Sequence, residues 1–105
     1  MSFTGEFIDA ISNKNKIRVT FFSKQDQANV TRLCAPMDYG HSKKAHDKSN
    51  RFHLWDYDSD SGSHTLSILP TQVINMEFLD EQFCPSEFVT WQPAWILPRD
   101  WGVHS

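Results

Sequence analysis

Positive charge and aromatic rings meet in one stretch of the chain, between positions 41 and 57. Four of the ten Lys and Arg residues fall between positions 41 and 51, and the run RFHLWDY follows directly. Cations pair with phosphate groups, and flat rings stack on nucleobases. The pattern predicts a nucleotide or single-stranded nucleic-acid site in which Arg51, Lys43 and Lys44 contact phosphate. Three residues could offer the ring: His53, Trp55 and Tyr57. The alternative is a solvated loop whose charges only keep the chain soluble.

A second candidate site lies at the end of the chain. Three of the four tryptophans, Trp91, Trp95 and Trp101, fall within the last fifteen residues, and two prolines there exclude one continuous helix. Two interpretations are open. The segment can lie as an extended tail on the chain's own core, since a buried indole covers a large area. It can also form the interface of a homodimer or of a complex with another protein, because Trp is enriched at binding hot spots.

Residue types that bind metals or carry catalysis are present, but their spacing does not fit such sites. Cys34 and Cys84 form neither a CxxC pair nor a disulfide framework. The acidic run DYDSDSG lacks the Gly and the bidentate Glu of a calcium loop, since Ser61 and Ser67 stand there. The sequence has no nucleophile motif and no glycine-rich phosphate loop. We therefore predict that the protein is not an enzyme and holds no metal or cofactor.

Length and composition limit what can position these residues. The chain has 105 residues, 39% of them hydrophobic and 22% charged, with a formal net charge of −3. This length is typical of one domain with one core, so we predict a single domain over 1–105. No apolar run approaches the roughly 20 residues that span a bilayer, and the first residues lack the basic region of an export signal. The sequence predicts a cytoplasmic protein without membrane contact.

The apolar periodicity predicts a mainly β fold. Residues Phe7, Ile8 and Ile11 share one face of a short helix within 1–13, and from Lys16 onward the pattern alternates as in a half-buried strand. Five strands are predicted, over 16–22, 29–34, 51–58, 64–69 and 73–79. Pro36 ends the second strand because it has no N–H to donate, and 37–50 is then a loop. Five short strands favour a closed or nearly closed barrel over 16–83, followed by the tail at 84–105.

The order of these motifs resembles the WYL domain over about residues 6–84. The run FIDAI at 7–11 precedes the strand IRVTFF at 17–22, and RLCAP at 32–36 is similar to the family's Arg-x-Val-x-Pro. Asp38-Tyr39-Gly40 follows. Phe52-His53-Leu54 stands where the family has Trp-Tyr-Leu, and DEQF at 80–83 is similar to its closing acidic-Phe signature.

This resemblance implies a small SH3/Sm-like five-stranded barrel and a bacterial regulatory or accessory module. Such modules take part in transcription regulation or defence and sense nucleotide-like or nucleic-acid ligands. Carried over to this sequence, the ligand site would comprise Arg32, Arg51 and His53, supported by Lys43 and Lys44. The expected function is therefore a non-enzymatic module for a nucleotide-like ligand or single-stranded nucleic acid. The alternative is a protein-interaction or dimerisation module that acts through the Trp-rich tail.

Overall fold

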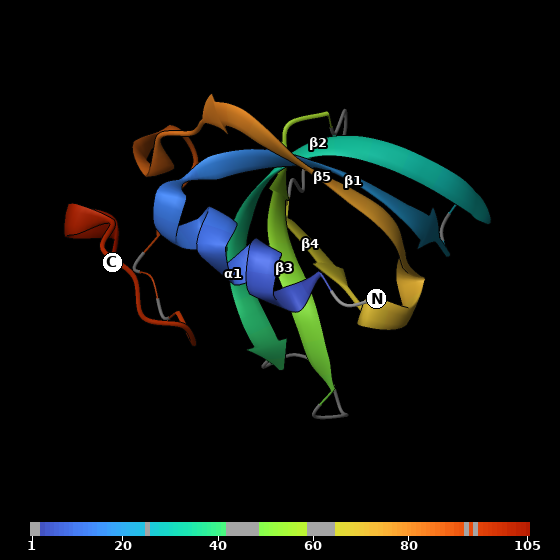
Figure 1. Cartoon of the computed structure of the whole chain (residues 1–105). Helices are drawn as coiled ribbons and strands as arrows, with labels where there is room; N and C mark the ends of the chain where they lie inside the picture. Colours follow the sequence, from blue (N-terminus) through green and yellow to red (C-terminus); the bar gives the residue numbers. More distant parts are fainter. Residues whose placement is uncertain (1–2, 25, 42–48, 59–64, 92, 94) are drawn as a thin grey trace.

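One antiparallel sheet of five strands, in the order β4-β3-β2-β1-β5, forms the frame of the molecule (Figure 1). The computed structural model describes residues 3–24, 26–41, 49–58, 65–91, 93 and 95–105. The elements, in chain order, are α1 (Thr4–Asn13), β1 (Asn15–Ser23), β2 (Ala28–His41), β3 (Asn50–Asp56), β4 (Thr65–Ile68), the 3-10 helix η1 (Pro70–Gln72), β5 (Val73–Gln82) and the 3-10 helices η2 (Pro85–Glu87) and η3 (Gly102–His104).

The predicted N-terminal helix is confirmed as α1. Its buried residues are Phe7, Ala10 and Ile11, which lie on one face as their spacing requires. The helix ends where Lys14 adopts the left-handed conformation, with φ of 58°. The ring of Phe7 packs edge-on against Phe52 of β3, with the ring centroids 4.7 Å apart. The helix therefore covers one face of the sheet and closes the core there.

The alternation in β1 also produces the predicted two-sided strand. Ile17, Val19 and Phe21 are buried, whereas Arg18 lies on the exposed face and pairs with Glu77 of β5. Successive side chains of a strand point to opposite faces, so this pattern fixes which face meets the core. The core cluster also takes residues from the other strands and from the segment after β5: Cys34, Leu54, Ile68, Met76, Phe83, Phe88 and Trp101.

The second strand is longer than the sequence predicts. The expectation that Pro36 ends it is wrong, because β2 continues to His41 and so includes the first part of the expected loop. β2 pairs with β1 only as far as Cys34, and beyond that point it pairs with β3. A register shift between Pro36 and Asp38 marks a bulge. Proline is tolerated at a bulge and at an edge without a neighbouring strand, since no ladder N–H is needed there.

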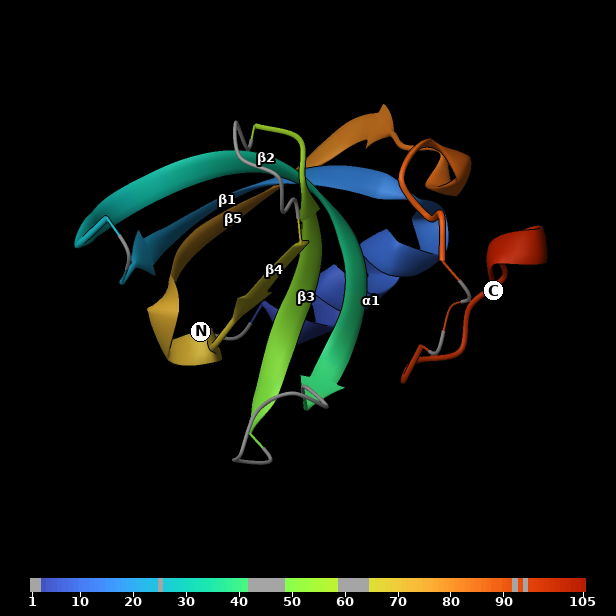
Figure 2. The ribbon, with the colours of Figure 1, turned by 180° about the vertical axis from the view of Figure 1, so that it is seen from behind.

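The sheet bends strongly but is not closed into a barrel among the described residues. β4 and β5 are the two edges of the strand order, and the described pairings include none between them. β4 has only four residues, and η1 follows almost at once and leads the chain into β5 beside β1. Figure 2 shows β2 curving along its length, with its two halves beside different strands. The fold is thus mainly β with one short α-helix. No helix in the described ranges is long and apolar enough to cross a membrane.

Candidate functional site

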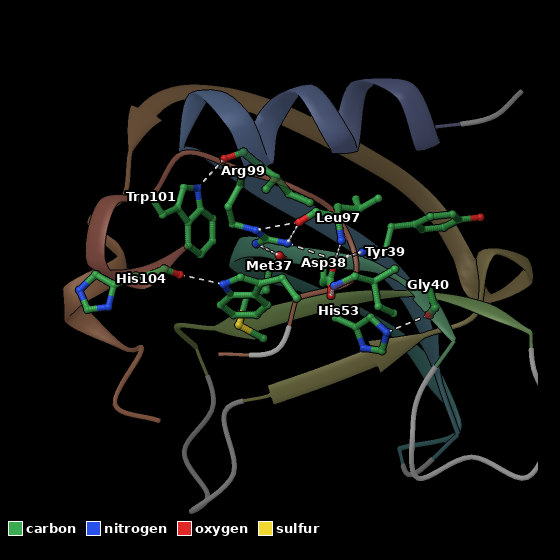
Figure 3. Close-up of polar contacts among 12 residues, drawn as sticks. Met37, Asp38, Tyr39, Gly40, His53, Leu97, Arg99, Trp101 and His104 are labelled. Carbon is green, nitrogen blue, oxygen red and sulfur yellow. Dashed lines mark hydrogen bonds and ion pairs between the residues drawn. The ribbon is translucent and has the colours of Figure 1, made fainter. Parts of the chain in front are cut away.

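The carboxylate of Asp38 joins the C-terminal segment to β2 (Figure 3). Asp38 lies directly after the bulge and is only 6% exposed. Its Oδ2 accepts the N–H of Ile96 at 2.7 Å, and its Oδ1 accepts the N–H of Leu97 at 3.0 Å. Oδ1 also accepts from the N–H of Tyr39 at 3.0 Å and from Nη2 of Arg99 at 3.1 Å. We call Asp38 with these four donors the Asp38 clamp.

Arg99 is the charged partner within this clamp. Its side chain is 1% exposed, and the guanidinium carbon lies 4.3 Å from the ring centroid of Trp95 and 4.6 Å from that of Trp101. Nη1 donates to the carbonyl of Met37 at the bulge of β2. Burial lowers the pKa of Arg99 to about 10, although Asp38 acts in the opposite direction. The guanidinium is therefore still charged at neutral pH, and the buried ion pair with Asp38 is intact.

The three tail tryptophans occupy different environments. Trp101 is 4% exposed and donates its indole N–H to the carbonyl of Ile11 in α1 at 3.0 Å. Trp95 is half-buried and donates to the carbonyl of His104 at 2.8 Å. Trp91 is 41% exposed and meets the edge of Trp95 at a centroid distance of 6.1 Å. Trp95 and Trp101 thus lie on the chain's own core, and Trp91 is the exposed member.

A chain of ring contacts connects the tail to the end of β3. Phe83 lies 5.5 Å from Trp101 and 5.7 Å from Phe88, measured between ring centroids. Phe88 in turn stacks on Trp55 at 5.3 Å, with 16° between the ring planes, and meets the edge of Tyr57 at 6.4 Å. Two of the three rings that the sequence predicts as stacking candidates, Trp55 and Tyr57, therefore each contact a ring of their own chain.

The predicted ligand residues of β3 do lie on one face. Arg51, His53 and Trp55 alternate with buried residues and are each half-buried. Nε2 of His53 lies 2.9 Å from the carbonyl of Gly40, and Nδ1 lies 2.9 Å from Oγ of Ser67. A carbonyl only accepts, so Nε2 carries a proton and, in the neutral ring, Nδ1 accepts from the Ser67 hydroxyl. These two bonds fix the imidazole between β2 and β4.

Arg32 lies near the end of β3 and away from Arg51 and His53. It pairs with Val19 of β1, whereas Arg51 pairs with Gly40, which lies further along β2 beyond the bulge. Nε of Arg32 instead lies 3.8 Å from Oδ2 of Asp56. The structure therefore does not bring Arg32 beside Arg51 and His53. Lys43 and Lys44 lie outside the described residues.

A groove of about 490 Å³ opens beside the Asp38 clamp. Ile96, 45% exposed, lies at this groove and contacts β2 at Gly40, where a Cβ would come within 2.5 Å of Cδ1 of Ile96. The residues that line it are Pro93, Trp95, Ile96, Leu97, Pro98, Arg99 and Ser105. We call this groove, together with Trp91, which contacts Trp95 of the lining, the C-terminal surface.

Sequence reasoning named Trp91 and Trp95 as candidates for a partner interface, but it missed Asp38 and Arg99, which fix this surface to the sheet. Asp38 appears in the sequence only as part of Asp38-Tyr39-Gly40, and Arg99 as one cation among tryptophans. Nothing in the spacing of positions 38 and 99 indicates that they pair. Two features together could have indicated the pair. Asp38 directly follows an apolar strand, and Arg99 lies between two tryptophans, so both charges are candidates for burial. A buried charge requires a partner of opposite sign.

Neither cysteine belongs to a metal cluster in the part of the chain that the structure describes. Cys34 is buried, and burial raises the pKa of its thiol, an effect to which Asp56 adds. Cys84 is exposed and its Sγ lies 2.9 Å from Oγ of Ser86. Within the described ranges, no three His, Cys, Asp or Glu residues gather as a metal site would require.

Comparison with known proteins does not place the chain in a family. No protein-family model matches it, and neither a curated protein nor a solved structure is significantly similar to it. The resemblance to WYL domains therefore stays a prediction from the motifs. Two surfaces of the molecule can bind a partner: the C-terminal surface and the face of β3 with Arg51, His53 and Trp55.

Proposed function

We propose that the chain is a non-enzymatic binding module on an SH3/Sm-like, WYL-like sheet, and that it binds a protein partner through the C-terminal surface. The observation that carries this proposal is the exposure of two large apolar side chains. Ile96 is 45% exposed and lines the groove, and Trp91 is 41% exposed and contacts Trp95 of the lining. Large apolar side chains at the rim of a concave site are typical of binding surfaces, and Trp is the residue most often found at hot spots. The SH3/Sm-like assignment is supported by the strand order, in which the last strand pairs with the first.

The Asp38 clamp supports the same proposal. It fixes the backbone of Ile96 and Leu97 through two charged hydrogen bonds, so the groove is formed before a partner arrives. A preorganised surface loses less conformational entropy on binding, and affinity rises accordingly. The fixed backbone also explains why Ile96 stays at the surface: its N–H is held by Asp38 while its side chain lies at Gly40.

A peptide-display selection on the full chain tests this proposal. Peptides selected on the wild-type protein should lose at least tenfold in affinity for Trp91→Ala and for Ile96→Ala, since each removes an exposed apolar contact. Ile74→Ala is the matched control, because Ile74 is 50% exposed on β5. Equal binding to all three variants would refute the C-terminal surface. Sedimentation of the wild type over a range of concentrations shows separately whether the partner is a second copy.

A second candidate function rests on the face of β3. Arg51, His53 and Trp55 lie side by side there, which supports a nucleotide-like ligand or single-stranded nucleic acid as the partner of a cytoplasmic bacterial regulator. The test is a salt titration of binding to a labelled single-stranded oligonucleotide. We expect affinity to fall steeply with salt, and to be lost in the variant with both Lys43→Glu and Lys44→Glu.

The control for this titration is Arg18→Gln. Arg18 is an exposed arginine on β1 that pairs with Glu77, and it belongs to neither surface. The Arg51→Gln variant should bind the oligonucleotide more weakly than the Arg18→Gln variant. Absence of binding at low salt would remove this second function and leave the protein-binding proposal unaffected.

A further inference from the structure

The charge that the C-terminal segment presents to solvent is negative. Between positions 83 and 105 the charged side chains, with His104 neutral, are Glu87, Arg99 and Asp100. Arg99 is 1% exposed and its charge is balanced by Asp38, so it adds almost nothing to the field outside. Asp100 is exposed and follows directly on Arg99, which lines the groove. The segment that lines the groove therefore carries an exposed acid next to the lining residue Arg99, and no exposed Lys or Arg.

The exposed indole of Trp91 also favours a positively charged partner. A ring quadrupole attracts a cation over its face, and the attraction is strongest for Trp. The chain already uses this interaction inside the clamp, where the guanidinium of Arg99 lies over Trp95 and Trp101. Those two indoles are occupied, whereas Trp91 is 41% exposed.

The groove itself selects for apolar groups. Its lining is mostly proline and aliphatic side chains, with Pro93, Ile96 and Pro98 among them, and the carboxylate of Asp38 behind it is already saturated by its donors. A polar group would gain little from these proline and aliphatic side chains. An apolar side chain has no hydrogen bonds with water to give up, and it gains contact with the lining.

Resting on the proposed function, we infer that the partner is a basic segment of another protein. In this complex an apolar side chain enters the groove, and a neighbouring Lys or Arg lies against Trp91 and Asp100. The formal net charge of −3 of the whole chain assists the approach of such a segment at long range. A polyanion such as a nucleic acid does not fit this surface.

The peptides from the display selection test this inference by their composition. We expect those that depend on Trp91 to be enriched in Lys or Arg next to an apolar residue. A synthetic copy of the best peptide with Gln in place of each Lys or Arg should bind the full chain more weakly, and the difference should shrink at high salt. Peptides that depend on Trp91 and are neutral or acidic would refute the inference and leave the proposed function standing. Peptides that never depend on Trp91 or Ile96 would refute the function itself.

The acid can be tested separately. Asp100→Asn should lower the affinity for the basic peptide by about two- to fivefold, which is the effect of one exposed charge contact. Asp80→Asn is the matched control, because Asp80 is an exposed acid on β5 that is not part of the C-terminal surface. The Gln-containing peptide should bind wild type and Asp100→Asn equally. Asp100 does not act through its charge if Asp100→Asn lowers the affinity equally for the basic and the Gln-containing peptide. The same conclusion follows if Asp100→Asn and Asp80→Asn lower the affinity for the basic peptide equally.

Discussion

Asp38 and His53 face each other as directly paired residues of β2 and β3, yet they hold different parts of the molecule. His53 bonds to Gly40 and Ser67, on the two strands next to its own. Asp38 bonds to Ile96 and residues near it, 58 positions away along the chain. One side chain therefore fastens neighbouring strands to each other, and the other fastens a distant segment to the sheet.

This difference determines how much each residue contributes to the free energy of unfolding. The contacts of His53 join strands that are already paired through their backbones, so the sheet keeps its register without them. The contacts of Asp38 join two segments that share no strand pairing, and its partner Arg99 is a buried charge. A buried charge that loses its partner is far more costly than a lost neutral hydrogen bond. Substitutions in the Asp38 clamp should therefore lower the free energy of unfolding much more than substitutions on the face of β3.

Asp38→Ala should have the largest effect of any change considered. It leaves the guanidinium of Arg99 buried without its counter-ion and removes the acceptor of three backbone N–H groups, those of Tyr39, Ile96 and Leu97. We therefore expect a loss of about 3–5 kcal/mol in the free energy of unfolding. Urea unfolding followed by Trp fluorescence and by circular dichroism measures it. A shift of the Trp emission to longer wavelength at low urea, before the sheet signal changes, would show that the tail detaches first.

The double variant Asp38→Leu with Arg99→Met is the control for this prediction. Replacing both charges by apolar groups leaves no charge buried alone, so it should be less destabilising than Asp38→Ala. A loss below about 1 kcal/mol for Asp38→Ala would contradict the clamp, since it is smaller than a single unpaired buried group costs.

Gly40→Ala tests the contact between the sheet and the tail. The added Cβ would lie 2.5 Å from Cδ1 of Ile96, and Gly40 has a φ of 155°, which side chains with a Cβ rarely adopt. We expect a loss of about 1–3 kcal/mol in the free energy of unfolding, the range for overpacking. Adding Ile96→Ala should recover the part that is due to the collision. If the two changes are additive in a double-mutant cycle, the tail does not press on Gly40.

The sequence predicts those features that depend on residues close together in the chain better than those that depend on distant residues. The spacing of Phe7 and Ile11 predicts α1, and the alternation from Ile17 to Phe21 predicts β1, because both patterns depend only on local geometry. The strand order and the bend depend on which strands pair, and the bulge that lets β2 continue past Pro36 leaves no mark in the periodicity. The pairing of Asp38 with Arg99 depends on the whole fold, so residue spacing alone could not show it.

On the face of β3 we expect a smaller effect. Ser67→Ala removes the hydroxyl that bonds Nδ1 of His53, and the loss should be about 0.5–1.5 kcal/mol, as for an ordinary hydrogen bond. Thermal unfolding measures this difference. Thr71→Ala, at an exposed position of η1, is the control. A loss for Ser67→Ala as large as that for Asp38→Ala would remove the contrast between the two regions.

Tyr57→Phe should have the smallest effect at neutral pH. The Tyr57 hydroxyl is buried and has no hydrogen-bond partner among the described residues, so removing it leaves the free energy of unfolding unchanged or raises it by up to about 1 kcal/mol. Burial, with a further contribution from Glu87, raises the pKa of Tyr57 from its ordinary value of 10 to about 12. The folded state therefore keeps the proton that the unfolded state loses.

The sign of the pH dependence follows from this pKa. The contribution of Tyr57 to stability is fully present below pH 10 and is lost as the pH rises toward about 12. Urea unfolding at a series of pH values should show a fall in this window for the wild type and a smaller fall for Tyr57→Phe. Tyr39→Phe removes the other of the two tyrosines and is the matched control. If Tyr57→Phe and the wild type fall in parallel, the hydroxyl of Tyr57 is in contact with water, and the end of β3 is more open than the ring contact with Phe88 implies.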